Sequence, residues 1–443
     1  MDGFTEYTLD DDWFSKRLPW ISTYYIYIES LVVEMSEEMW TICEHVISAS
    51  HIRGFSRGIR DEQKERLRLA VKQYIPKAHT EPTATDATLI MMGGIGSSKE
   101  IYEPFYDELL QRGLRIRAVW SMDTAHHGAS YVLNEGMIGD EPHWFDSSRD
   151  LLHMMNHFQE LMPPPLIAMG LSWGCVSIVS LAIFHPRLFS GIVLMEPTLR
   201  TTSAVRRIDR IDTGIDLSHR AVAMVKRRDL WPSLEDASNR LRATPHFGPF
   251  DSRVFERVIK YHLRPASPAM QSYIGSPDAV TLTTPKSMEV GTMMCPDPPF
   301  AGHPEAADFH NRPEDLDTTI VQGFYRGEFA QVYRDLPYIL PATLYVWGSR
   351  SLGGTAYSKD IAGRTGVGYG GNGGLDTGRV QEIVLDDMGH NIPLDKPGKA
   401  AETVNLWLRE ELTRWENDFA ERKQQPEFKV ALGPEWRQRI AKL

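Results

Sequence analysis

The segment that most restricts the fold of this chain is residues 170–174, which read Gly-Leu-Ser-Trp-Gly. An apolar run (165–169) precedes it, and a stretch of small and apolar residues with helical character (175–182) follows it. This order predicts a strand, a sharp turn and a helix, with Ser172 at the apex of the turn. A serine in so strained a turn needs glycine on both sides, because a Cβ two positions away would collide with the neighbouring strand or helix. Ser172 is therefore the first candidate nucleophile, although the same pattern also occurs in ordinary loops.

Short apolar runs alternate with amphipathic segments on both sides of this turn. Buried strands are expected over residues 87–92, 115–120, 165–169, 190–195, 342–348 and 380–385, and helices over 98–112, 147–161, 175–182 and 399–415. Within residues 40–55 and 67–75, apolar alternation predicts an antiparallel pair of strands that opens the sheet. Strands that alternate with helices predict an α/β protein with a mostly parallel central sheet and helices on both faces.

The length of 443 residues is that of an α/β enzyme with an inserted subdomain rather than of one compact domain. We expect an N-terminal extension of unknown role (1–34), the first part of a catalytic core (35–198), an inserted cap (199–336) and the second part of the core (337–443). Over the cap the strand–helix alternation lapses, and polar helices alternate with Pro-rich linkers. The cap is therefore expected to be mainly helical.

A serine hydroxyl becomes an effective nucleophile only when a base takes its proton, and a carboxylate must hold that base in the right tautomer. His390 follows the last expected strand and precedes the last expected helix. In chains with this serine turn the histidine comes last in chain order, so His390 is the candidate base. The alternative is that His390 is an ordinary histidine of a surface loop.

The acid is predicted at an unusual place. In most α/β-hydrolases, the enzymes with this serine turn, it follows the seventh strand, but residues 348–351 read Gly-Ser-Arg-Ser and contain no carboxylate. Glu196 ends the sixth strand, at the carboxyl edge of the sheet where catalytic groups gather. Glu196 is thus the candidate acid. Asp386 and Asp387 are the alternatives, but they lie too near His390 in the sequence to orient it easily.

The oxyanion that develops during attack on a carbonyl needs two donors. The N–H of Trp173, the residue after the nucleophile, is one candidate, and the N–H of Ile95 in the Gly-rich loop 93–96 is the other. Many related enzymes begin this loop with His-Gly, and the histidine commonly braces it. This chain has Gly93 and Gly94 there, which leaves the second donor open.

Several segments resemble a family of fungal α/β-hydrolases of secondary metabolism that includes acyl-CoA hydrolases and proteins of toxin gene clusters. The segments are Ala-Val-Lys-Gln-Tyr at 70–74, Lys-Glu-Ile-Tyr-Glu-Pro at 99–104, Arg-Asp-Leu-Leu at 149–152, Asn-His-Phe at 156–158 and His-Pro-Arg-Leu-Phe at 185–189. The resemblance covers residues 40–200 and the region of His390. It implies the α/β-hydrolase fold and an acid after the sixth strand, although the relatives carry Asp where this chain has Glu196.

The chemistry that this resemblance implies is attack by Ser172 on a thioester or ester carbonyl, an acyl-enzyme, and deacylation by a water that His390 activates. The expected substrate is a small acyl compound, with CoA as one carrier, and no cofactor is expected. Cationic side chains of the cap are candidates to receive the CoA phosphates, or else form a solvated helix face: Arg200, Arg206, Arg207, Arg210, Lys226, Arg227 and Arg228.

Charge and cysteine content exclude several other roles. The formal net charge of −11 argues against nucleic acid as a partner. Three scattered cysteines, Cys43, Cys175 and Cys295, give no disulfide framework and no metal-ligand spacing, which indicates a reducing compartment. The apolar stretch 18–33 is too short and too polar for a membrane span and follows an acidic cluster, so no stable membrane insertion is expected.

The last three residues, Ala441, Lys442 and Leu443, are a close variant of the Ser-Lys-Leu peroxisomal address. The family that the chain resembles is often peroxisomal. The sequence therefore predicts recognition by the peroxisomal import receptor and location in the peroxisome, with the cytoplasm as the alternative.

Two other reactions fit the same residues. One is hydrolysis of an oxyester or lactone in place of a thioester. The other is a cyclisation or lyase step in which Ser172 or His390 only transfers a proton. Epoxide hydrolases and dehalogenases are disfavoured, because they need an aspartate where this chain has Ser172.

Overall fold

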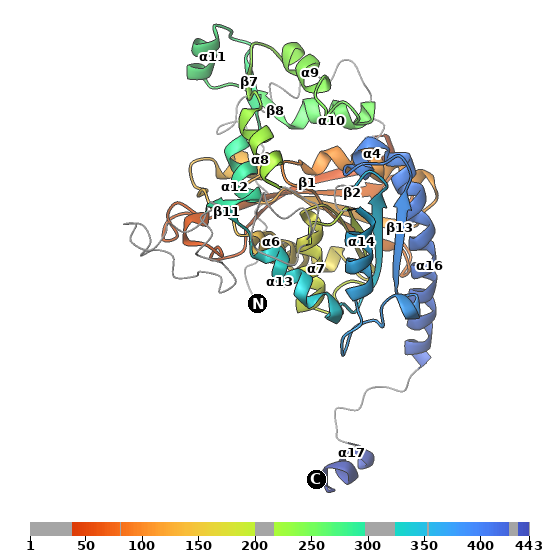
Figure 1. Ribbon diagram of the computed structural model, residues 1–443. Helices are drawn as coiled ribbons and strands as arrows, with labels where there is room; N and C mark the ends of the chain where they lie inside the picture. The colour runs from red at the N-terminus through yellow and green to blue at the C-terminus, as the bar shows by residue number, and fades with distance from the viewer. Residues whose placement is uncertain are drawn as a thin grey trace.

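The computed structural model describes residues 38–79, 81–199, 217–296, 324–351, 354–424 and 433–442. The predicted extension, 1–34, lies outside these ranges, as do Arg200, Arg206, Arg207, Arg210 and Leu443. Figure 1 shows a central sheet flanked by helices, with the inserted cap above it.

Eight strands form the central sheet, in the order β1-β2-β4-β3-β5-β6-β12-β13. β2 pairs antiparallel with β1 and with β4, and all other pairs are parallel. The expected α/β-hydrolase architecture, including the antiparallel opening pair, is therefore confirmed. The strands are β1 Trp40–Ser48, β2 Arg68–Pro76, β3 Ala87–Met92, β4 Ile116–Met122, β5 Leu166–Leu171, β6 Gly191–Met195, β12 Ala342–Gly348 and β13 Val380–Leu385.

Helices cover both faces of this sheet and bury a separate apolar core on each (Figure 1). On one face α4 (Glu103–Gln111) packs against α16 (Pro397–Gln424). On the other face α6 (Trp144–His157) and α13 (Glu328–Asp335) pack against α7 (Gly174–Phe184). A parallel sheet is stable only when both faces are covered, which is why its central strands β3, β5, β6 and β12 are almost wholly apolar.

Two helices differ from their predicted bounds for local reasons. α6 begins three residues before the predicted start, because the side chain of His143 accepts the backbone N–H of Phe145 at 3.1 Å and caps the helix. The helix expected over 98–112 is divided into a 3-10 turn, η2 (Lys99–Tyr102), and α4, where Pro104 occupies the first turn. Proline is compatible with the first turn of a helix but not with its interior.

The cap contains a small sheet that the sequence analysis did not predict. Strands of two or three residues, β7 (Leu230–Trp231), β8 (Leu263–Pro265) and β9 (Val280–Leu282), pair antiparallel in the order β7-β9-β8. Such strands are too short to show an alternating pattern. The described helices of the cap are α8 Leu217–Lys226, α9 Leu234–Arg242, α10 Ser252–Tyr261, α11 Pro268–Ile274 and α12 Lys286–Met293.

Buried polar contacts fix the cap over the carboxyl ends of the strands. Arg257 of α10 forms a 2.6 Å ion pair with Glu103 of α4, and both side chains are less than one-tenth exposed. The backbone N–H of Gly128 donates to the Thr284 hydroxyl at 2.8 Å. These contacts are directional, so they attach the cap and also fix its position over the sheet.

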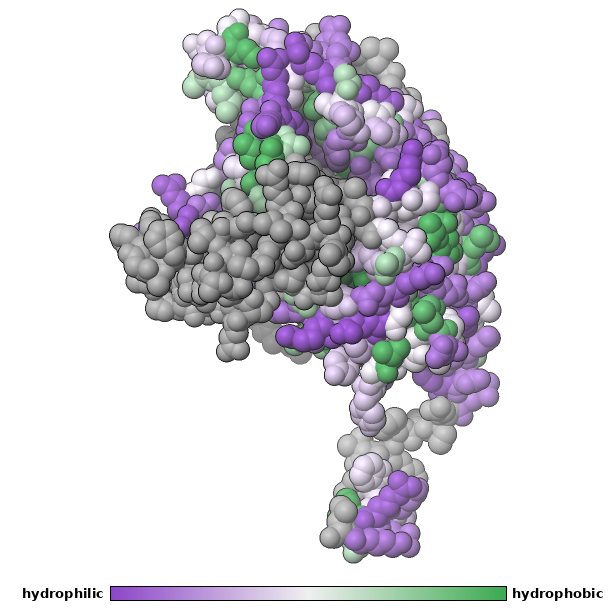
Figure 2. Space-filling view, in the orientation of Figure 1, coloured by the Kyte–Doolittle hydropathy of each residue, from purple (hydrophilic) through white to green (hydrophobic). Residues whose placement is uncertain are grey.

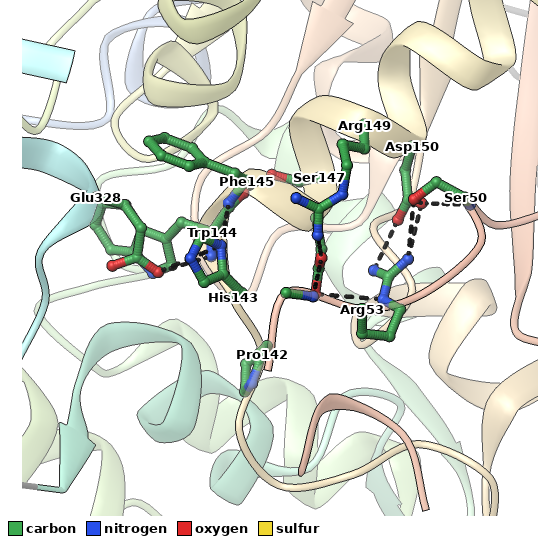
Figure 3. Close-up of polar contacts among 12 residues, drawn as sticks. Ser50, Arg53, Pro142, His143, Trp144, Phe145, Ser147, Arg149, Asp150 and Glu328 are labelled. Carbon is green, nitrogen blue, oxygen red and sulfur yellow. Dashed lines mark hydrogen bonds and ion pairs between the residues drawn. The ribbon is translucent and has the colours of Figure 1, made fainter. Parts of the chain in front are cut away.

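The start of α6 connects three distant parts of the chain (Figure 3). Arg53, in the connection between β1 and β2, forms a bidentate pair with Asp150 at 2.9 and 3.0 Å, and its Nε lies 3.3 Å from Asp146. Ser50 donates to the same Asp150 carboxylate through its N–H and its hydroxyl. Because the Arg53 and Asp150 side chains are almost fully buried, removal of one partner would leave an uncompensated charge.

The same region fixes the indole of Trp144. Its backbone N–H donates to Glu328 at 2.9 Å (Figure 3). Its Nε1 donates to the carbonyl of Thr292 in α12 at 2.5 Å. Arg326 lies over the indole and pairs with Glu328 at 3.1 Å. These contacts hold Trp144 in place, and it lines a cavity that Ser172 also lines.

The final described helix, α17 (Pro434–Ile440), lies apart from the body in Figure 1. All seven of its residues are exposed, and hydrophilic side chains cover most of the surface that Figure 2 shows of it. Within the described ranges, no helix has both the length and the apolar composition that crossing a membrane requires.

Candidate active site

Ser172 lies between β5 and α7 with a positive φ of 54°. A Cβ on Gly170 would lie 2.9 Å from the backbone nitrogen of Cys175, and one on Gly174 would lie 2.3 Å from the carbonyl oxygen of Met92. Both approaches are too close for any side chain, so each glycine is required by the turn. The N–H of Ser172 donates to the carbonyl of Met195 at 2.9 Å, which ties the turn to the end of β6. The serine is thus held in a strained backbone by its surroundings.

Glu196 lies beside His390 at the carboxyl ends of β6 and β13. Nδ1 of His390 is 3.2 Å from Oε2 of Glu196, and the carboxylate is only 3% exposed. An ionised carboxylate can only accept, so the contact places the imidazole proton on Nδ1 and leaves Nε2 as the basic nitrogen. That is the arrangement a general base requires.

The end of β12 and the turn after it contain no carboxylate that could serve as the acid. They supply hydrogen bonds to Glu196. The N–H of Gly348 donates to Oε1 at 2.7 Å, and the hydroxyl of Ser351 donates to Oε2 at 2.7 Å. Glu196 also has a positive φ, 48°. Two donors together with His390 thus fix both oxygens of the carboxylate.

Gly348 also controls how close the histidine loop comes. A Cβ at this position would lie 2.4 Å from the carbonyl oxygen of Met388 and 2.7 Å from that of Gly389. The backbone just before His390 therefore packs directly on the end of β12. Asp387, one of the alternative acids, is 73% exposed and pairs with Arg350 at 3.2 Å and Lys396 at 3.6 Å. Asp386 is exposed as well.

Thr198 is a polar neighbour of the serine that the sequence analysis did not identify. Its hydroxyl lies 3.2 Å from Oγ of Ser172. Tyr357 of α14 (Gly354–Arg364) fixes this segment, because its hydroxyl donates to the carbonyl of Pro197 at 3.0 Å and accepts the N–H of Leu199 at 2.9 Å. Only the fold brings Tyr357 to this segment, so no local sequence signal identified it.

The two candidate oxyanion donors belong to segments that border Ser172. Trp173 is the N-cap of α7, where backbone N–H groups lack partners within the helix and favour negative charge. Ile95 lines the cavity together with Ser172. Gly94 passes so close to the turn that its Cβ would lie 3.6 Å from Cβ of Ser172.

Tyr102 braces this Gly-rich loop. Its hydroxyl accepts the N–H of Gly94 at 3.0 Å and donates to the Ser97 hydroxyl at 3.2 Å. A Cβ on Gly93 would lie 3.1 Å from the Tyr102 hydroxyl oxygen, so a histidine there would compete for the same space. Burial raises the pKa of Tyr102 to about 12, so the phenol remains protonated at neutral pH. The bracing group that the sequence left open is therefore a tyrosine further along the chain.

His262 connects the cap to the same loop. Its Nε2 accepts the N–H of Ser98 at 3.1 Å. Burial, with the nearby Arg227 charge as the second cause, lowers the pKa of His262 to about 4. The imidazole is therefore neutral near pH 7 and remains an acceptor.

A cavity of about 550 Å³ lies between the core and the cap, and Ser172, Glu196 and His390 line it. Most of the cap side is apolar, with Met224, Leu241, Phe247, Phe250 and Leu282. One wall carries charge, from Lys226, Arg227 and Glu289. Among the described residues, no group of three or more His, Cys, Asp or Glu side chains is placed to hold a metal ion.

Comparison with known proteins places this geometry among the α/β-hydrolases. Residues 83–240 match the family model described as serine aminopeptidase, S33. The type I acyl-CoA thioesterase mpaH' of Penicillium brevicompactum is 33% identical over 422 residues, which cover 90% of this chain and 95% of the relative. The abhydrolase domain-containing protein AKT2 of Alternaria alternata is 24% identical and covers 56% of this chain and 85% of its own.

A solved structure has the same fold. The peroxisomal α/β-hydrolase Lpx1 of Saccharomyces cerevisiae superposes with a TM-score of 0.62 at 17% identity, covering 91% of this chain and 96% of its own. At this identity the similarity shows the fold alone.

We expect Tyr102→Phe to slow phosphonylation of Ser172 by a fluorophosphonate about tenfold, because the Gly94 N–H loses its acceptor and the loop loses its position. Tyr106→Phe is the matched control, since it removes an equally buried hydroxyl from α4. Stopped-flow labelling rates and melting temperatures of both variants provide the measurement. Equal labelling rates for the two variants would show that Tyr102 does not brace the loop.

Proposed function

The chain belongs to the α/β-hydrolase family that includes the type I acyl-CoA thioesterases of Penicillium, and from that membership we propose that it hydrolyses the thioester of an acyl-CoA through an acyl-enzyme on Ser172. The observation that carries the proposal is the 3.2 Å contact between His390 and the doubly hydrogen-bonded Glu196, beside a serine in a strained turn. All three side chains line one cavity.

In the first half-reaction, Nε2 of His390 takes the proton of Ser172 while Oγ attacks the thioester carbonyl. The N–H groups of Trp173 and Ile95 stabilise the oxyanion. As the tetrahedral intermediate collapses, the carbon–sulfur bond breaks and His390 returns the proton to the departing sulfur, which becomes the thiol of CoA. The products of this half are an ester on Ser172 and free CoA.

In the second half, His390 takes a proton from water and the hydroxide attacks the acyl-enzyme. Collapse of the second intermediate breaks the bond to Oγ and returns the proton to Ser172. Throughout, Glu196 orients the imidazole and stabilises the imidazolium. The net reaction consumes one water and releases a carboxylic acid.

We propose that the cavity binds an apolar acyl group with aromatic character, such as that of a polyketide-type intermediate. Its volume is within the range of pockets that enclose small-molecule ligands, and its cap side presents methionine, leucine and phenylalanine. Lys226 is exposed at the end of α8 and lines the same cavity. We propose that it receives a CoA phosphate, for which a lysine acts as a point charge.

For wild type we expect covalent labelling by a fluorophosphonate and release of free thiol from at least one member of a panel of acyl-CoAs. Both should be lost in Ser172→Ala, by intact-mass spectrometry and a thiol assay. Ser180→Ala is the control, because Ser180 of α7 does not line the cavity and its hydroxyl instead donates to Ser148 of α6 at 2.6 Å.

Three outcomes separate the alternatives. Labelling without thiol release from any acyl-CoA would contradict a thioesterase and favour an esterase or lactonase. Absence of labelling in wild type would contradict an activated serine and favour a cyclase or lyase. Labelling that persists in Ser172→Ala would place the nucleophile elsewhere.

We also propose that the protein acts in the peroxisome, with Ala441, Lys442 and Leu443 as its address. The described part of this end, α17 with Ala441 and Lys442, is exposed, as a receptor-bound segment must be. The yeast structural neighbour is itself described as peroxisomal.

With a fluorescent protein fused to the N-terminus, we expect the full chain to co-localise with a peroxisomal marker and the chain lacking residues 441–443 to spread through the cytoplasm. Glu435→Ala, on the exposed face of α17, is the control that should stay peroxisomal. A cytoplasmic full-length protein, or a shortened one that still reaches peroxisomes, would overturn the proposal.

A further inference from the structure

An ion pair between two cap residues lies in the wall of the cavity, which other polar and apolar residues of the cap also line. Arg227 follows α8 and Glu289 belongs to α12, and their side chains meet at 2.7 Å. The Glu289 side chain is 5% exposed and that of Arg227 is 19% exposed. Both residues line the cavity that contains Ser172.

Stability alone does not account for this pair. Burying two charges costs more than packing apolar side chains of the same size, and replacing such pairs by apolar residues is often neutral or stabilising. Burial raises the pKa of Glu289, and the charge of Arg227 opposes that rise. A costly buried charge in a cleft is a mark of a binding or catalytic site.

The pair lies next to the Gly-rich loop. A Cβ on Gly96 would lie 3.1 Å from Cδ of Glu289 and 3.2 Å from its Oε2, so this carboxylate oxygen faces the loop. Its other oxygen, Oε1, accepts from Arg227. Gly94, which borders Ser172, is two residues away along the same loop, at most about 7 Å.

Lys226 is the neighbour of this pair in the chain. It precedes Arg227, is exposed at the end of α8 and lines the same cavity. A pantetheine arm that joins a thioester at Ser172 to a phosphate at Lys226 would extend through this cavity to the residue next to Arg227. In that arm two methylene groups separate the sulfur from a secondary amide, which offers one N–H donor and one carbonyl acceptor.

We propose that Arg227 and Glu289 form a subsite for this amide, in which the guanidinium donates to the amide carbonyl and Oε2 of Glu289 accepts the amide N–H. The inference rests on the proposed thioesterase function and adds to it the group by which the thiol side of the substrate is recognised. A subsite built to hydrogen-bond a substrate group discriminates strongly against analogues that lack it.

The test uses two thioesters of one acyl group that wild type accepts. The N-acetylcysteamine thioester retains the amide, and the S-pentyl thioester replaces it by methylenes; neither carries a phosphate, so Lys226 does not contribute. We expect wild type to prefer the amide-bearing thioester in kcat/KM by about tenfold or more. In Glu289→Gln, the carboxamide turns its oxygen to Arg227 and presents NH₂ to the substrate N–H, so that preference should fall to about twofold or less.

Two further variants keep the result interpretable. Arg227→Met combined with Glu289→Leu removes both charges and both hydrogen-bonding groups, so the loss of preference should persist without an unpaired buried charge. Glu135→Gln is the matched control. It disrupts the 2.6 Å ion pair between Glu135 and Arg264, which joins the core to the cap but does not line the cavity. This variant should keep the wild-type preference.

An equal loss on both thioesters in the Glu289 variants would overturn the subsite, because the pair would then act on structure alone. If wild type cleaves neither these thioesters nor any acyl-CoA, the proposed function itself fails. Turnover with an unchanged preference removes only the subsite.

Discussion

The contact between Glu196 and His390 is the interaction around which the rest of the site is arranged. A serine with a positive φ and a pair of donors is a far weaker catalyst unless the imidazole accepts a proton on the correct nitrogen. Here a glutamate at the end of β6 provides that orientation, and both of its oxygens are fixed by donors from the turn after β12. Each neighbouring feature makes this contact possible or places it beside the cavity.

Close backbone packing makes the contact possible. Because Gly348 has no side chain, the loop before His390 lies against β12. Because Gly174 has none either, α7 begins against the end of β3. Tyr102 and Tyr357 then fix the two loops on either side of the serine through their hydroxyls. The cap closes over these groups, and the Arg227–Glu289 pair provides a polar patch in an otherwise largely apolar enclosure.

Local patterns in the sequence were sufficient to predict the strands of the central sheet and to suggest the candidate nucleophile. The strand over 87–92 has the predicted bounds, since a six-residue run that is apolar except for Thr88, between a polar segment and a glycine loop, leaves little choice. Glu196 was proposed because it ends a strand, at the edge of the sheet where the carboxyl ends of parallel strands meet.

The groups that were missed act across long sequence distances. Gly348 donates to a residue 152 positions away, and Tyr357 contacts Pro197 across 160 positions. The strands of the cap sheet were missed for the opposite reason, because two or three residues cannot display a period. Tyr102 is only eight positions from Gly94, but its role depends on a turn whose shape the sequence does not reveal.

The account depends most directly on the identity of the acid. The decisive measurement is the rate at which a fluorophosphonate labels Ser172 in Glu196→Gln and in Asp387→Asn, relative to wild type, with folding checked by circular dichroism. If Glu196 orients His390, Glu196→Gln should label about 10⁴-fold more slowly, by analogy with triad-acid amides. Asp387→Asn should label at the wild-type rate. A wild-type rate for Glu196→Gln, with slow labelling of Asp387→Asn, would contradict the account.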